Sequence, residues 1–304
     1  MGNLSSELDS FVGGIVSDIA SPAASDARLR LRRRLFGAAS ALALLRSMPA
    51  LAQPSDLEKI RATGVLKVAV YNDNFPFSDQ GQGIDVEIGR AVADKLGLKL
   101  SLLPFPAGEN VNDDLRNMVW KGHYLGYGPA DVLLHVPVDR QLMAANDRVE
   151  IFAPYYRDTL KIAIRRSAVN QWNGLPSLQG KAVGVEKISL GAWVFMSEDN
   201  GKYRDDARIY EKLPEMMADL KSGKLAAVVG NKSQVEAAVM GNADFEIVDA
   251  PFTRMPRQGW VVGMSVKRSN TELARAVQQA VNDLLADGSI KRIFEKHNVA
   301  PVSP

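Results

Sequence analysis

The sequence has no cysteine and only three histidines in 304 residues. Without cysteine the chain can form no disulfide, no thiolate metal site and no lipid anchor on a cysteine. The histidines, His123, His135 and His297, lie far apart and lack the spacing of metal ligands. We therefore predict no metal site and no cofactor, and we expect each histidine to lie in a loop or at the surface.

Several catalytic motifs are missing as well. The sequence has no G-x-G-x-x-G after the first predicted strand, no G-x-x-x-x-G-K-[ST], no H-E-x-x-H and no G-x-S-x-G. These motifs bind dinucleotides or phosphates, hold zinc, or present a nucleophilic serine. We therefore predict no catalytic residues and expect a protein that is not an enzyme.

The first 52 residues have the pattern of an export signal. Arginines at 32–34 precede a short apolar stretch at 37–45, and residues 50–52 read Ala-Leu-Ala, a small-residue cleavage signal. The apolar stretch is too short to span a bilayer, which needs about 20 apolar residues. We predict a signal peptide over residues 1–52 and a periplasmic location. Residues 33–36 also resemble the twin-arginine export motif, and a general secretion signal is the alternative.

The rest of the chain carries almost no net charge. Taking the six arginines and four acidic residues of the leader from 37 basic and 35 acidic residues leaves 31 of each. Nucleic-acid binding would need a basic face, so we exclude a nucleic-acid partner. No later stretch is long and apolar enough for a membrane helix, so we expect no stable membrane anchor.

Hydrophobic periodicity in the first half predicts strands that alternate with helices. After a short helix at 56–63, the expected strands are 66–70, 98–102 and 131–136, and the expected helices between them are 84–96 and 115–121. This β-α-β-α-β order is typical of a parallel sheet with helices on both faces.

The second half repeats the same logic. The expected strands are 181–185, 226–229, 245–248 and 261–266, and the expected helices are 189–198, 214–222, 232–240 and 273–284. The mature chain has no short-period repeat, so we interpret the two similar halves as two α/β lobes.

Six phrases of the sequence, in this order, resemble the family 3 periplasmic solute-binding proteins of ABC importers. They are "LKVAVYNDNFPFSD", "GIDVEIGRAVADKLGLKL", "FAPYYRDTLKIAIRR", "LPSLQGKAVGV", "LKSGKLAAVV" and "ELARAVQQAVNDLLADGSIKRIFEKH". The resemblance implies a type II periplasmic-binding-protein fold, with a parallel-rich sheet in each lobe and two hinge crossings. It divides the chain into lobe 1, residues 53–156 and 257–304, and lobe 2, residues 157–256. It also implies a monomer that holds a small molecule between the lobes and delivers it to an ABC permease.

The residues that would bind a ligand depart from the pattern of the amino-acid-binding members. An arginine after the third strand pairs with the ligand carboxylate in those proteins, because a guanidinium donates two parallel hydrogen bonds. Here the loop at 135–143 has Arg140 out of register. Asn231 stands in place of the amine-binding aspartate and cannot supply its negative charge. The candidate ligand-binding set is Asn74, Phe75, Phe77, His135, Asp139, Arg140, Lys187, Ser189 and Asn231.

These departures favour a small polar ligand that is not an ordinary α-amino acid. A first alternative is an accessory protein of a periplasmic quinoprotein (methanol) dehydrogenase with a vestigial cleft, since "NDNFPFSD" and "DVLLHVPVD" resemble that subgroup. A second is a cleft enzyme of the dehydratase type, which would need a general acid or base with a tuned pKa. Glu186 and Asp139 are the candidates for that role, and we expect both to be solvated loop carboxylates. Phe77 is equally well explained as a core residue.

Overall fold

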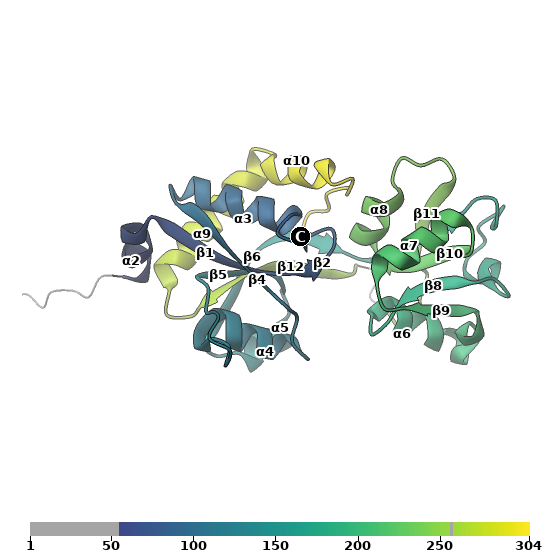
Figure 1. Ribbon diagram of the computed structural model, residues 1–304, viewed down its shortest axis with the longest axis horizontal. Coiled ribbons are helices and arrows are strands. Elements are labelled where there is room, and N and C mark those ends of the chain that lie inside the picture. Colours follow the sequence, from purple (N-terminus) through teal and green to yellow (C-terminus); the bar gives the residue numbers. More distant parts are fainter. Residues whose placement is uncertain (1–54, 256–257) are drawn as a thin grey trace, which may run out of the picture. The chain divides into compact units, whose positions relative to one another are not determined.

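The computed structural model describes residues 55–255 and 258–304, in which two five-stranded sheets each carry helices on both faces (Figure 1). The predicted signal peptide at 1–52 lies outside the described residues. We call the sheet that contains the first strand, with its helices, the first lobe, and the other sheet, with its helices, the second lobe. No helix in the described ranges combines the length and the apolar character that crossing a membrane requires.

The first lobe is built on a sheet with the strand order β4-β1-β5-β12-β6. Strand β1 (Val65–Tyr71) pairs in parallel with β4 (Lys99–Phe105) and β5 (Val132–Pro137). Strand β12 (Trp260–Lys267) runs antiparallel to both β5 and β6 (Val149–Asp158). The predicted β-α-β-α-β unit is therefore confirmed, but the sheet is mixed rather than parallel throughout.

Both faces of this sheet are covered. Side chains of β1 alternate between the faces, as the pleat of a strand requires: Val68 packs with the cluster of α3 (Ile84–Lys95), α9 (Thr271–Ala286) and α10 (Ser289–Lys296), and Ala69 packs with the opposite cluster. The opposite face carries α4 (Val111–Leu115) and a π-helical turn, η3 (Arg116–Lys121). The helix predicted at 115–121 is thus two elements of different helical type.

The second lobe has the strand order β11-β7-β10-β8-β9. Strand β8 (Val183–Glu186) pairs in parallel with β10 (Ala227–Asn231) and β9 (Ala207–Tyr210). Strand β7 (Leu160–Arg165) is antiparallel to β10 and β11 (Phe245–Asp249). One face packs on α6 (Leu190–Ser197), and the other packs on α7 (Leu213–Ser222) and α8 (Lys232–Val239).

The remaining elements are short. The first lobe also contains α2 (Asp56–Thr63), β2 (Asp73–Asn74), β3 (Ser78–Asp79) and α5 (Arg140–Ala145), and the second contains the 3₁₀ turns η4 (Leu175–Leu178), η5 (Glu198–Gly201) and η6 (Arg204–Asp206). The helix predicted at 56–63 is confirmed as α2. Ser55 and Glu58 form a capping box, and Gly64 ends the helix with φ +70°.

Two connections join the sheets, and the first of them is very short. Strand β6 ends at Asp158 and β7 begins at Leu160, so Thr159 alone separates strands of different sheets. The return connection leads to Trp260, which packs against the cores of both lobes, and its residues 256–257 lie outside the described part. The lobe boundaries predicted at 156 and 257 stay predictions.

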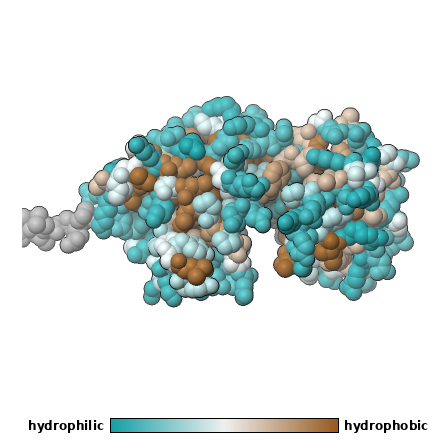
Figure 2. All heavy atoms as spheres, viewed as in Figure 1, coloured by the Kyte–Doolittle hydropathy of each residue, from teal (hydrophilic) through white to brown (hydrophobic). Residues whose placement is uncertain are grey.

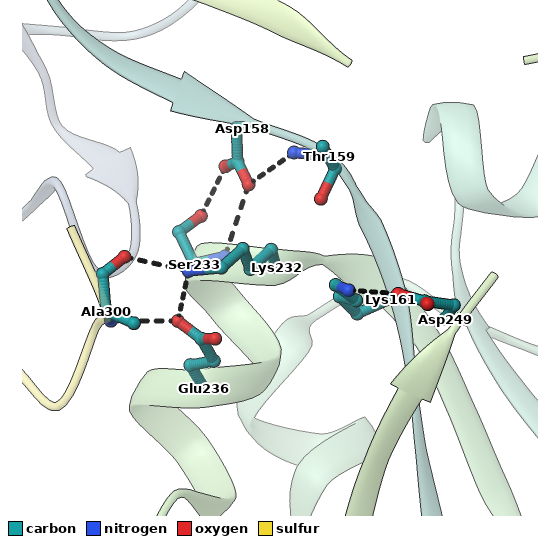
Figure 3. Close-up of polar contacts among 8 residues, drawn as sticks. All are labelled: Asp158, Thr159, Lys161, Lys232, Ser233, Glu236, Asp249 and Ala300. Atoms are coloured by element: carbon teal, nitrogen blue, oxygen red, sulfur yellow. Dashed lines mark hydrogen bonds and ion pairs between the residues drawn. The ribbon is translucent and has the colours of Figure 1, made fainter. Parts of the chain in front are cut away.

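A buried polar network joins the lobes beside this connection (Figure 3). The Asp158 carboxylate accepts hydrogen bonds from the Ser233 hydroxyl at 2.5 Å and the Thr159 amide at 2.9 Å. Burial raises the pKa of Asp158, and these hydrogen bonds oppose the rise. The Lys232 ammonium lies 2.6 Å from the Glu236 carboxylate, and both bind the backbone of Ala300. The start of α8 is therefore tied to β6 and to the C-terminal segment.

We expect Glu236→Gln to lower the free energy of unfolding by about 3–5 kcal/mol, because it leaves the buried Lys232 ammonium without its counter-charge. The Lys232 and Glu236 side chains are only 10% and 9% exposed. Glu295→Gln is the matched control: Glu295 also follows its lysine by four residues on a helix, but the two side chains are 65% and 51% exposed. Its expected cost is about 0.3–0.5 kcal/mol. Equal losses of stability in urea denaturation would contradict this assignment.

A second expectation concerns two phenylalanines of one loop. Phe77 is 2% exposed and packs against Tyr156 and Phe294, whereas Phe75 is 39% exposed. Phe77→Ala should therefore lower the free energy of unfolding by about 3–5 kcal/mol, and Phe75→Ala by less than about 1 kcal/mol. Thermal and chemical denaturation of both variants give the comparison. A small effect at Phe77 would show that this side chain is not part of the core.

Candidate functional site

A cavity of about 270 Å³ lies where β8 and β10 end and α6 and α8 begin. Because β8 and β10 are parallel neighbours, their carboxyl ends lie at the same edge of the sheet, which is where open α/β sheets bind ligands. The lining residues are Glu186, Ser189, Leu190, Gly191, Val229, Gly230, Asn231, Gln234 and Trp260. The cavity thus brings together two predicted site residues, Ser189 and Asn231, which are 42 positions apart.

Two larger hollows, of about 540 and 600 Å³, lie along the segment 249–255. Each reaches the stretch next to residues 256–257, which are outside the described part. Neither is lined by the residues that follow the parallel strands β8 and β10. A third hollow, of about 450 Å³, lies between β6 and α9 and is likewise not lined by those residues. We therefore take the cavity of about 270 Å³ as the candidate site.

The walls of this cavity are fixed by two helix starts. Ser189 caps α6: its hydroxyl accepts a hydrogen bond from the Ala192 amide at 3.0 Å and donates to the Glu186 carbonyl at 2.6 Å. At α8, the Asn231 amide donates to the Gln234 side-chain oxygen at 3.1 Å. These hydrogen bonds fix the backbone at both helix starts. The Ser189 hydroxyl uses its donor and one acceptor position in the cap.

Glu186 supplies the negative charge of the cavity. It is the last residue of β8 and is partly buried, so the expectation of a solvated loop carboxylate is wrong for this residue. Its carboxylate accepts one long hydrogen bond, from the Gln234 amide nitrogen at 3.4 Å. Burial raises the pKa of Glu186 and the Asp73 carboxylate raises it further, while the bond from Gln234 lowers it. None of the nine lining residues is a lysine or arginine.

Two residues of the predicted set lie inside the first lobe. The His135 ring is 4.2 Å from the Phe77 ring, and its Nδ1 is 3.2 Å from a carboxylate oxygen of Asp85. The Tyr155 hydroxyl donates to Asp85 at 2.6 Å and accepts from the His135 amide at 3.1 Å. The expectation that His135 is a loop or surface residue is therefore wrong, because it lies within β5, with a side chain 17% exposed. Phe77 is a core residue, which was one of the two interpretations that the sequence left open.

The other predicted site residues lie away from the cavity walls. Asp139 caps α5 and is solvent-exposed, as expected, accepting hydrogen bonds from the amides of residues 141 and 142. Arg140 begins the same helix and is also exposed. Lys187 is half-exposed and forms an ion pair with Glu211. Asn74 lies in the short strand β2 beside Asp73, and Phe75 follows it in the turn to β3.

The other two histidines do not line the cavity. His297 Nε2 lies 2.8 Å from a carboxylate oxygen of Glu87, and the His123 ring stacks on Tyr127 at 4.3 Å. Within the described ranges, no three acidic, histidine or cysteine side chains gather in a way that would hold a metal ion.

Among the lining residues that the sequence analysis did not predict, Gln234 and Trp260 have the largest polar or aromatic side chains. Gln234 had a signal: an asparagine followed three residues later by glutamine is a capping-box pattern, which directs the glutamine back to the helix start. Trp260 had none, because its place depends on β12 returning from the second lobe to the first. The charge of Glu186 was noted, but its burial is a tertiary property.

No protein-family model matches the chain. Among curated proteins, the L-cystine-binding protein TcyJ of Escherichia coli K12 is 24% identical over 281 residues, which cover 87% of this chain and 94% of that protein. Cyclohexadienyl dehydratase of Pseudomonas aeruginosa is 40% identical, but only over 77 residues, which cover 24% of this chain and 29% of the enzyme.

Solved structures give the same architecture. An ancestral cationic amino acid solute-binding protein, AncCDT-1, aligns with a TM-score of 0.64 at 20% identity, over 80% of this chain and 100% of that one. TcyJ and AncCDT-1, which both span most of this chain, are named as binding proteins, and the enzyme match covers less than a third of its enzyme. The chain therefore has the two-lobed α/β fold of periplasmic binding proteins, with a mixed sheet in each lobe.

Proposed function

We propose that this chain is a periplasmic solute-binding protein of family 3, and that it delivers a small polar solute to an ABC permease. The observation that carries the proposal is the cavity at the carboxyl ends of β8 and β10, in a chain with this fold. The similarity to TcyJ over 87% of the chain supports the assignment to an importer of the amino-acid type. In this proposal residues 1–52 are the export signal.

The proposal keeps the predicted division, with lobe 1 at 53–156 and 257–304 and lobe 2 at 157–256. The solute rests on Glu186 and Asn231 of the second lobe and contacts the loop at 73–75 of the first. The effect of Asp73 on the pKa of Glu186 supports this, because it requires the two carboxylates to be near each other. A solute that touches both lobes stabilises the closed form relative to the open one.

An ordinary α-amino acid is a poor fit for the residues at this cavity. Asn231 carries no charge for an α-ammonium group, and Arg140 lies on the exposed start of α5 rather than among the cavity walls. The solute is therefore a small polar molecule other than a common amino acid, even though TcyJ is named for L-cystine and AncCDT-1 for cationic amino acids.

The test is native mass spectrometry of the protein purified from its own periplasm, followed by thermal melting with the molecule it retains. We expect one retained small molecule, which at a hundredfold excess over Kd adds about 2.7 kcal/mol of stability, or about 5–10 °C in Tm. Leu190→Trp fills the cavity and should abolish this shift. Leu285→Trp is the matched control: both leucines are on helices, at 39% and 38% exposure, but Leu285 is in the first lobe and outside the cavity.

Retention of a periplasmic dehydrogenase, with no small molecule and no ligand-dependent shift in Tm, would contradict the proposal and favour an accessory protein. Tight stoichiometric binding of glutamate would show that the site recognises an ordinary amino acid, and would contradict the proposed class of solute. A Tm shift that survives in Leu190→Trp would place the binding site elsewhere in the protein.

Replacement of Glu186 by glutamine should raise the stability of the ligand-free protein at pH 7. Burial and Asp73 raise the pKa of Glu186, so the ionised carboxylate destabilises the folded state. Below the ordinary pKa of a carboxyl group, Glu186 of the wild type is protonated in both the folded and the unfolded state, and the two proteins should be equally stable. The advantage of Glu186→Gln appears as the pH rises through the raised folded-state pKa. Melting of both proteins between pH 4 and pH 7 measures it.

Glu211→Gln is the control for that comparison, since Glu211 is 69% exposed in its pair with Lys187. An exposed pair contributes between about 0 and 1 kcal/mol, so this variant should melt at or slightly below the wild type at pH 7. A lower Tm for Glu186→Gln than for Glu211→Gln would mean that Glu186 stabilises the fold.

A further inference from the structure

The charge on the described walls of the cavity is negative. Glu186 is the only charged residue among the nine that line it, and the carboxylate that acts on it from the first lobe, Asp73, is also negative. In the described residues one hydrogen bond reaches the Glu186 side chain, and at 3.4 Å it is long. The carboxylate is therefore partly desolvated, and no lysine or arginine of the described ranges 55–255 and 258–304 forms an ion pair with it.

A tryptophan lies in the same wall. Trp260 lines the cavity at the beginning of β12 and is held in place by packing against both cores. An indole attracts cations through its ring face, and its attraction is greater where water is excluded. A partly buried carboxylate and an indole together favour a positively charged group and disfavour an anion.

The rim of the cavity is apolar. Leu190 lines the cavity at 39% exposure, and the adjoining Ile188 is 95% exposed with φ +58°. A β-branched residue with positive φ is strained, and such strain is found mainly where function requires it. In the view of Figure 2, hydrophobic atoms also lie on the surface of the second lobe around α6. The entrance therefore suits an apolar portion of the solute.

We propose that the cavity recognises an organic cation, with its ammonium or guanidinium group at Glu186 and Trp260 and its apolar portion at Leu190. This inference rests on the proposed function and specifies the class of solute. The charge that binds the solute is then on β8, at Glu186, instead of at the start of α8, where Asn231 stands. A ligand N–H donates to the Glu186 carboxylate, and such charge-assisted bonds are stronger than neutral ones.

The start of α6 does not reverse this preference. A helix N-terminus favours negative charge, but its effect is that of a partial charge. Ser189 already satisfies the Ala192 amide at that end. The full negative charge of the Glu186 carboxylate, together with that of Asp73, outweighs the partial positive charge at the start of α6 for a ligand group in the cavity.

The test is isothermal titration calorimetry of the ligand-free protein with agmatine, glutarate and glucose as probes. Agmatine carries a guanidinium and an ammonium group on an apolar chain without a carboxylate, glutarate is a dianion of similar length, and glucose is uncharged. We expect agmatine to bind and the other two not to bind. Glu186→Gln should weaken agmatine binding on the order of ten- to hundredfold, and Asp73→Asn should weaken it several-fold through the lost long-range attraction.

Glu211→Gln is the matched control, because Glu211 is an exposed carboxylate of the same lobe outside the cavity, and it should leave agmatine affinity within about twofold. Glu186→Gln is expected to be at least as stable as the wild type, so lost binding cannot be attributed to unfolding. Unchanged agmatine affinity in that variant overturns the inference.

The failure of this inference and the failure of the proposed function give different results. If the molecule retained from the periplasm is neutral or anionic, or if glutarate or glucose binds and agmatine does not, the protein is a binding protein and the cation inference is wrong. If no small molecule is retained and none of the probes binds, both are wrong. A retained amine or guanidine whose binding requires Glu186 supports both.

Discussion

The parallel pairing of β8 with β10 is the constraint on which the site depends. It places the ends of two strands that are 45 residues apart in sequence at one edge of the sheet, so that Glu186 and Asn231 face the same cavity. Each strand runs almost directly into a helix, and the caps at Ser189 and Asn231 fix where those helices begin. A change of register between the strands would separate the lining residues without changing any of them.

This arrangement has an electrostatic cost. A carboxylate at the end of β8 is partly removed from water and lies near a second negative charge, and both effects oppose its ionisation. Glutamine at the same position would avoid that cost, so stability of the fold gives no reason for Glu186. A charge that weakens the empty protein is understandable where a bound group of opposite charge restores the balance. Asp158 differs from Glu186 because two short hydrogen bonds, from Ser233 and Thr159, oppose the effect of its burial, although its pKa is still raised.

Much of the fold was predictable because its signals are local. The periodicity of 84–96 and the stop at Gly64 are properties of adjacent residues, and the structure confirms α3 and α2. Strand β7 was missed because Thr159 alone separates it from β6, so the sequence reads as one extended crossing. Strand β9 was missed because it is an edge strand, where the exposed Arg208 and Ile209 break the hydrophobic pattern.

The site was less predictable than the fold, since burial is decided by distant packing. His135 falls at the end of the strand predicted at 131–136, yet it was expected in a loop or at the surface, because a histidine gives no local sign of burial. The ring of Phe77 and the carboxylate of Asp85 cover it from segments at least 50 residues away. The resemblance to solute-binding proteins located the second-lobe helix starts correctly at Ser189 and Asn231. It did not indicate Trp260, which is brought there by the second crossing between the lobes.

One helix connects the cavity to the hinge. In the first turn of α8, Asn231 and Gln234 line the cavity, while Lys232 and Ser233 between them bind Ala300 and Asp158. Successive residues of a helix point about 100° apart, so a single rigid turn presents both sets. A solute that shifts this turn must therefore change the hydrogen bonds at Asp158 and Ala300, where the lobes are joined. The charges there are largely buried, so a lost partner is costly to replace, which favours discrete arrangements of the hinge over a continuous range.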